Sequence, residues 1–222
     1  MPEPLLYHIR LQVSQASFTN SAVVNIDASG NFQPLPPGAN PSGAGQATWN
    51  GKKVPSYLLP KSTIYGFNGT FPGPMINLVY GRPALVRFEN DLDYKPSCLD
   101  RQDFGAPDWA FLTHQHNGHT APESDGQPHH MTDHDGGYQL GEWVDNLYMG
   151  YPAGGDGTEM QSFLWFHDHR MHHTGANVYK GMVGITPWYN PWDDYGDETD
   201  TRNPLNLHLP GVRSYDRADG TG

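Results

Sequence analysis

Short apolar or alternating runs recur along the chain and are separated by glycine and proline turns, a pattern typical of β-strands. The first run, 7–13 (YHIRLQV), alternates apolar and polar side chains at every step, which predicts a half-buried strand. Turn signals about every ten residues favour a β-sandwich or barrel, and no helix is strongly indicated. The other predicted strands are 63–67, 75–79, 84–88, 109–113, 162–166, 182–186 and 205–209.

Two long polar stretches interrupt these strands. Residues 27–51 collect Gly, Pro, Asn and Ser, and they predict an extended surface loop because the one strand before them cannot fold alone. Residues 117–161 are polar and glycine-rich and predict a long functional loop. The sequence therefore indicates one domain over 1–208, followed by a polar, linker-like tail over 209–222.

Charge and cysteine content narrow the class of protein. The 222 residues carry 13 Lys and Arg against 24 Asp and Glu, a net charge of -11 that argues against nucleic acid binding. No apolar run is long enough to span a membrane. No secretory leader is visible, so a cytoplasmic location is the default expectation and secretion stays open if a leader has been removed. The single cysteine, Cys98, has no neighbouring histidine and is interpreted as an incidental thiol.

Histidine is the one residue type that is concentrated in a single region. Of 12 histidines, 10 lie between 114 and 173, and two His-x-His pairs, His114/His116 and His167/His169, each follow an apolar run. On a strand, residues i and i+2 face the same way about 6.6 Å apart, so each pair can serve neighbouring metal ions. Imidazole suits copper, zinc, iron and nickel alike, so the pairs predict a polynuclear metal site without naming the metal. Histidines in polar flanking sequence are interpreted as solvated or incidental: His129, His130, His134, His172 and His173.

The segments around both histidine pairs resemble known copper motifs. Residues 113–126 (THQHNGHTAPESDG) and 165–184 (WFHDHRMHHTGANVYKGMVG) are similar to the first and second copper motifs of multicopper oxidases. The resemblance is to the branch of phenoxazinone synthase and the bacterial spore-coat laccases. Residues 67–74 (FNGTFPGP) and 81–88 (GRPALVRF) are similar to the first domain of that family. Most of 60–190 is covered, and the two spaced motifs match in order.

This resemblance implies an all-β fold, a cupredoxin-like Greek-key β-sandwich with long loops. It also implies an oxidoreductase that reduces O2 to water at a trinuclear copper cluster, after oxidising phenolic or aminophenolic substrates at a separate type 1 copper. Matched by motif, His114 would bind the type 2 copper, His116 and His167 one type 3 copper, and His169 the other.

The same resemblance gives a role to an acidic residue. Asp125, nine residues after His116, matches the family's carboxylate beside the cluster and is the candidate proton relay, although Asp-Gly is also a common turn sequence. Asp168 lies between two ligands on a strand end, so its side chain should face away from them and serve a structural role.

Half of the family's site has no counterpart here. Its third and fourth motifs, and with them the type 1 copper ligands, are missing from the sequence. The chain would therefore supply four of eight cluster histidines, and activity would require a second polypeptide that carries the remaining cupredoxin domains. Whether that partner is a separate gene product or part of a cleaved precursor stays open, as does the reducing substrate.

Two other functions compete with this interpretation. THQHNGH (113–119) also resembles the Thr-His-x-His-x-Asp-His motif of metallo-β-lactamase-like zinc hydrolases, but Gly118 replaces the metal-binding aspartate and the second histidine pair has no place there. A non-catalytic, copper-binding cupredoxin module is the other alternative.

Overall fold

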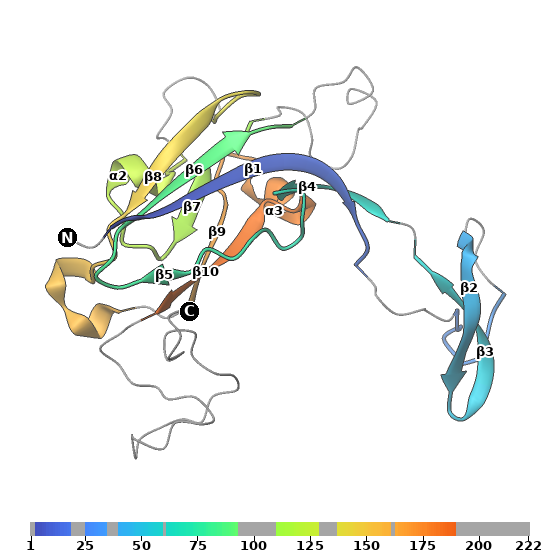
Figure 1. The fold of residues 1–222 in the computed structure, drawn as a ribbon. Coiled ribbons are helices and arrows are strands. Elements are labelled where there is room, and N and C mark those ends of the chain that lie inside the picture. The colour runs from blue at the N-terminus through green and yellow to red at the C-terminus, as the bar shows by residue number, and fades with distance from the viewer. Residues whose placement is uncertain are drawn as a thin grey trace, which may run out of the picture.

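The computed structural model describes residues 3–18, 25–34, 40–59, 61–92, 110–128, 137–160 and 163–189. Two four-stranded sheets and a separate two-stranded hairpin account for its strands (Figure 1). Neither α-helix in this part of the chain is long and apolar enough to cross a membrane. The elements are β1 (Leu5–Ala16), β2 (Asn40–Trp49), β3 (Lys52–Leu58), β4 (Ser62–Phe67), β5 (Leu78–Val79), β6 (Ala84–Asn90), β7 (Thr113–His116), α2 (Pro122–Asp125), β8 (Trp143–Tyr148), the 3₁₀ turns η1 (Ala153–Gly155) and η2 (Gly157–Glu159), β9 (Phe163–Asp168), α3 (Thr174–Lys180) and β10 (Val183–Tyr189).

The first sheet has the strand order β4-β1-β6-β8. β1 runs antiparallel to β4 and parallel to β6, and β6 runs antiparallel to β8. Along β6 the side chains of Ala84, Val86, Phe88 and Asn90 are buried while those between them are partly exposed. This alternation puts one face of the sheet in the core and leaves the other toward solvent.

The second sheet has the order β5-β10-β9-β7 and carries both histidine pairs. β9 is antiparallel to β10 on one side and to β7 on the other, so β7 forms an edge of this sheet. Leu164 and Phe166 of β9 are buried, whereas Phe163 is 67% exposed. Because neighbouring residues of a strand face opposite ways, Trp165 and His167 share the outer face with Phe163.

Aromatic side chains from both sheets form the centre of the core. The Phe166 ring on β9 lies 5.1 Å from that of Phe67 on β4 and 5.5 Å from that of Phe88 on β6. All three side chains are fully buried. Contacts of this kind hold the two sheets face to face and contribute about 0.5–1.5 kcal/mol per pair beyond the burial of area. The expected all-β, cupredoxin-like sandwich is confirmed.

Most predicted strands coincide with observed ones, with shifts at their ends. The strand predicted at 109–113 is observed further toward the C-terminus. Ala110 and Leu112 are buried, but β7 spans Thr113–His116 and so includes His114 and His116. Of 75–79, only Leu78–Val79 is a strand, although Ile76 already donates its N–H to the Ile185 carbonyl of β10 at 3.0 Å.

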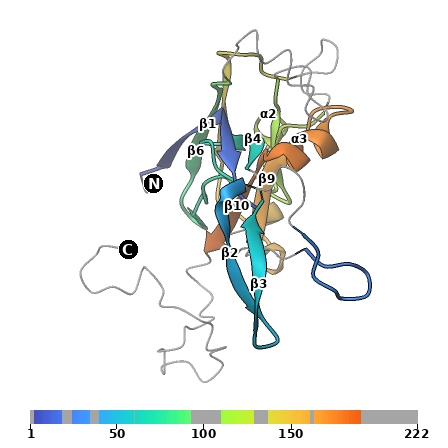
Figure 2. The same cartoon turned by 90° about the vertical axis from the view of Figure 1, so that its right-hand side faces the viewer.

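The prediction of a continuous loop over 27–51 is wrong, because β2 lies within it and pairs with β3. Both views show these strands side by side, projecting from the sandwich (Figures 1 and 2). β2 is built mostly of small and polar residues, so it lacks the apolar alternation that reveals a strand. The signal in the sequence is the turn: Asn50 and Gly51 have φ of 47° and 75°, the left-handed conformation that two-residue hairpin turns require.

The predicted loop over 117–161 likewise contains regular structure, namely α2, β8, η1 and η2. In β8 the buried face includes Asn146, whose side chain donates to the Tyr148 hydroxyl at 3.4 Å. A buried amide where an apolar residue is expected hides the alternation of this strand from sequence analysis.

Several predictions concern residues outside the described ranges. These are the strand at 205–209, the tail at 209–222, Cys98, and the histidines His129, His130 and His134. The boundary between domain and tail therefore stays a prediction.

Candidate metal centre

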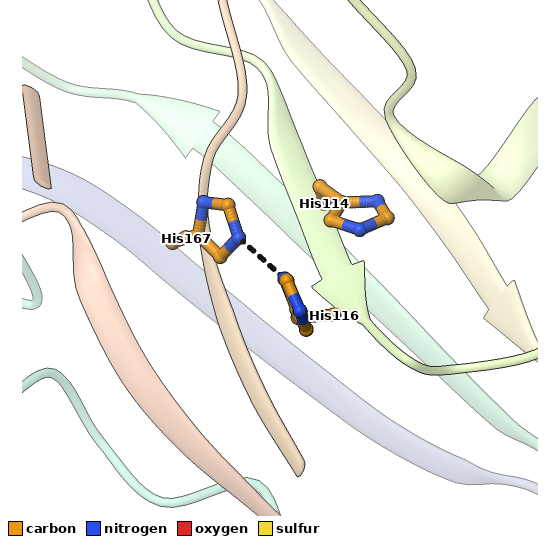
Figure 3. Close-up of side chains that lie close together, drawn as sticks. All are labelled: His114, His116 and His167. Atoms are coloured by element: carbon orange, nitrogen blue, oxygen red, sulfur yellow. Dashed lines mark hydrogen bonds between the residues drawn. The ribbon is translucent and has the colours of Figure 1, made fainter. Parts of the chain in front are cut away.

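The pairing of β7 with β9 places the two histidine pairs on one face. In this antiparallel register His114 lies opposite His167, and His116 lies opposite Trp165. Residues directly opposite each other share a face, and so do residues two positions apart on one strand. The structure therefore places His114, His116 and His167 on one face, and His169 follows directly after the end of β9. Figure 3 shows the first three converging from the two strands.

Each of the four imidazoles lies close to at least two of the others. The ring centroids of His114 and His169 are 4.8 Å apart, those of His114 and His167 are 5.5 Å apart, and those of His167 and His169 are 5.4 Å apart. One potential ligand atom from each of His114, His116 and His167 lies within 4.8 Å of the others. Three rings thus form a compact set of donors, and His169 extends it on the side of His114.

One close contact in the cluster joins two potential ligand atoms. Nδ1 of His116 lies 3.3 Å from Nε2 of His167 (Figure 3). His167 donates its Nδ1–H to the Asp168 carbonyl at 2.6 Å, so its Nε2 presents a lone pair toward His116. Two nitrogens at this spacing suit one first-row metal ion bound at about 2.0 Å from each. The donor set therefore fits a metal ion between His116 and His167, provided that His116 carries its proton on Nε2.

His114 is oriented in the same way by a backbone acceptor. Its Nδ1–H donates to the Asp125 carbonyl at 2.6 Å, which leaves Nε2 free to bind a metal. Burial lowers the pKa of His114, and burial lowers the pKa of His167 to about 4. Because only the neutral imidazole binds a metal, these depressed pKa values keep both ligands competent in mildly acidic solution.

His169 has an unpaired buried nitrogen among the residues that the structure describes. Its Nδ1 is buried without a hydrogen-bond partner, while its backbone N–H donates to the Leu112 carbonyl at 2.7 Å. Buried polar atoms are normally paired, so an orphaned one is expected where a ligand or water completes the site.

One aromatic residue of the site is missing from the sequence prediction. The Trp165 ring stacks on His167 at 4.1 Å between centroids and lies 5.1 Å from His116. It restricts both rings to one orientation. The signal was available: Trp165 is two residues before His167 on the same strand, so it shares the histidine face.

Asp125 lies in a turn and beside one of the clustered histidines. It ends α2, and its carboxylate accepts a hydrogen bond from the Thr120 hydroxyl at 2.9 Å and lies 3.3 Å from His114 Nδ1. Gly126 follows with φ of 67°, and a Cβ there would lie 1.9 Å from the Thr113 carbonyl oxygen. The Asp-Gly turn thus holds this carboxylate beside a histidine.

Asp168 is bonded away from the imidazoles, as its position on the strand predicts. The carboxylate is fully buried and accepts the backbone N–H groups of Leu112 at 2.9 Å and Arg170 at 3.1 Å. It also accepts the side-chain amide of Asn177 on α3 at 3.1 Å. Burial raises the pKa of Asp168. This carboxylate links the residue before β7 to the end of β9 and to α3. It therefore fixes the spacing between the two histidine pairs.

Replacing Asp168 with alanine is expected to lower the free energy of unfolding by about 3 kcal/mol or more, because three buried donors lose their acceptor. Thermal or urea denaturation monitored by circular dichroism measures this. The matched control is Asp156→Ala, which removes an exposed carboxylate bonded to Thr158 and should cost less than about 1 kcal/mol. Equal stability of the two variants would contradict the role assigned to Asp168.

Three other described histidines between 114 and 173 lie outside the cluster of potential ligand atoms. His119 and His172 are exposed and have φ of 47° and 64°, and His173 precedes the first turn of α3. None of the three belongs to the metal-binding group found in the described part of the chain. No role is assigned to His119.

Comparisons with known proteins find similarity to laccases and to a bilirubin oxidase. The chain is 32% identical over 141 residues to a laccase of Bacillus subtilis, a match that covers 60% of this chain and 26% of the laccase. It is 29% identical over 163 residues to a laccase of Haloferax volcanii, covering 67% of this chain and 26% of that protein. A bilirubin oxidase of Albifimbria verrucaria is 25% identical over 136 residues, covering 61% of this chain and 19% of that protein.

Solved structures align with the chain at low sequence identity. A multicopper oxidase named mgLAC aligns with a TM-score of 0.48 and 15% identity, covering 86% of this chain and 41% of that one. No protein-family model matches the sequence. The chain spans about a quarter of the length of the two laccases.

Proposed function

We propose that the chain is part of a multicopper oxidase and that it supplies half of the histidine ligands of a trinuclear copper cluster at which O2 is reduced to water; its similarity to two laccases supports this. The observation that carries this proposal is the convergence of two His-x-His pairs on one face, with three ligand atoms within 4.8 Å of one another. His114 is assigned to the type 2 copper, His116 and His167 to one type 3 copper, and His169 to the other. Copper, when bound, supplies the redox chemistry.

The side chains around the histidines hold the ligands and move protons. Hydrogen bonds to the carbonyls of Asp125 and Asp168 fix the tautomers of His114 and His167. Reduction of O2 to water consumes protons, and the imidazoles are occupied as ligands. We assign proton delivery to the Asp125 carboxylate, which lies 3.3 Å from His114 Nδ1.

Completion of the site requires other cupredoxin domains. We propose that these lie on a partner polypeptide, or on another part of a longer or cleaved precursor, and that they bring the other four histidines and the type 1 copper. The histidine face is suited to this because it points away from the core of the sandwich. The substrate proposed is a phenol or aminophenol oxidised at the partner's type 1 copper. The zinc-hydrolase and non-catalytic alternatives find no support in these comparisons.

Copper binding is expected to depend on this assembly, because a half-site gives each metal only one or two imidazoles. The isolated 24.7 kDa chain should bind copper weakly and without a fixed stoichiometry, whereas the complete protein should hold about four coppers. Metal analysis combined with native mass spectrometry of an active preparation distinguishes the two. Phenol oxidation by a preparation that contains only the 24.7 kDa species would overturn the proposal.

A further inference from the structure

A hollow of about 430 Å³ lies between β4 and α3, and none of the four clustered histidines lines it. Figure 2 shows α3 beside β4 and β9. Pockets that bind small molecules measure about 300–1,000 Å³, so this one is large enough for a molecule of one or two rings. Its position separates it from the candidate metal centre.

Exposed aromatic side chains from three distant parts of the sequence form its walls. Phe18 follows β1 and is 57% exposed, Phe71 follows β4 and is 41% exposed, and Tyr179 on α3 is 75% exposed. The rings of Phe18 and Phe71 already meet edge to face at 5.2 Å between centroids. Single exposed apolar residues are ordinary, but three aromatic rings gathered around one hollow favour a ligand with a flat, apolar face.

The bottom of the hollow is apolar and carries one cationic side chain. Ile64 and Tyr65 are 2% exposed, and the ammonium of Lys180, a residue only 8% exposed, lies 5.0 Å from the centre of the Tyr65 ring. The ring face compensates part of the lysine charge. A positive charge in surroundings of low polarity attracts an anion more strongly than the same charge in water.

From these contacts we infer that the hollow binds a planar aromatic anion of one or two rings, at a site distinct from the metal centre. The ring stacks among Phe18, Phe71 and Tyr179, and the anionic group lies toward Lys180. Ser62 and Thr63 also line the hollow and offer hydroxyl groups to a bound ligand. This inference does not rest on copper binding or on oxidase activity.

Isothermal titration calorimetry on the complete protein tests it with 1-naphthoate as the probe. Saturable binding at one site per chain is expected, with affinity at least tenfold lower for cyclohexanecarboxylate, which lacks the flat ring, and for 1-naphthamide, which keeps the ring but is neutral and is not a phenol. Tyr179→Ala should weaken binding of 1-naphthoate at least tenfold. Its matched control is Tyr151→Ala, because Tyr151 is 56% exposed but does not line the hollow.

Lys180→Met tests the charge separately, since it keeps most of the side-chain volume. It should remove the preference for 1-naphthoate over 1-naphthamide while leaving 1-naphthamide binding unchanged. No saturable binding at millimolar 1-naphthoate, or equal affinity of the Tyr179 and Tyr151 variants, would overturn the inference. Circular dichroism spectra matching the wild type are required of each variant, and Tyr179→Ala meets this most readily because its side chain is largely exposed.

Discussion

Alanine at His116 or at His167 is expected to remove type 3 copper from the complete protein and to lower oxidase activity at least about 10³-fold, a barrier increase of about 4 kcal/mol. The reason is the 3.3 Å contact between His116 Nδ1 and His167 Nε2, which makes the two nitrogens a shared binding position. Removing either leaves the metal a single imidazole from this chain. Metal analysis, electron paramagnetic resonance and activity assays on the same samples measure the effect.

The control for this pair is His8→Ala. His8 lies on the outer face of the other sheet, where it pairs with Glu89 at 2.6 Å, and loss of this exposed contact costs little. Copper content and activity should stay at the wild-type level. Full occupancy of the trinuclear cluster in the His116 or His167 variant would refute the ligand assignment.

Asp125→Asn is expected to retain copper and the type 1 colour while slowing reoxidation of the reduced protein by O2 at least tenfold, or about 1.4 kcal/mol in the barrier. Asparagine keeps the size of the side chain and an oxygen that can accept from the Thr120 hydroxyl, but it cannot release and rebind a proton at neutral pH. The His114 tautomer should survive because it depends on the backbone carbonyl of Asp125. Stopped-flow mixing of reduced protein with O2 measures the rate.

Thr120→Val separates proton transfer from positioning at the same carboxylate. It removes the hydroxyl that donates to Asp125 but leaves the acid in place, so reoxidation should slow less than in Asp125→Asn. If Asp125→Asn reoxidises at the wild-type rate with full copper content, Asp125 serves only as a turn residue.

The local part of the site could be predicted from the sequence. Four histidines in two pairs, each after an apolar run, identify both the residues and their common face, because side-chain direction on a strand has a period of two. The orientation of Asp168 away from the imidazoles follows from the same rule.

The contacts between strands could not be predicted in this way. That His114 faces His167, and that Trp165 faces His116, depends on how β7 and β9 align across a long separation in sequence. The hydrogen bond from His114 to the Asp125 carbonyl likewise depends on how α2 turns back on β7. Strands β2 and β8 escape sequence analysis for a different reason. They carry small, polar or amide side chains at positions where the hydrophobic pattern of a strand requires apolar ones.

The hydrogen bonds of Asp168 also determine which segments of the chain tolerate insertions and which do not. Because this carboxylate accepts the Leu112 N–H directly, the alignment of β7 with β9 is held at the strands themselves and does not depend on the connection between them. Insertions between 149 and 160, beyond β8 and around the 3₁₀ turns, should therefore leave the histidine geometry intact. A single residue inserted between Leu112 and His116 would turn at least one histidine to the opposite face and abolish the cluster.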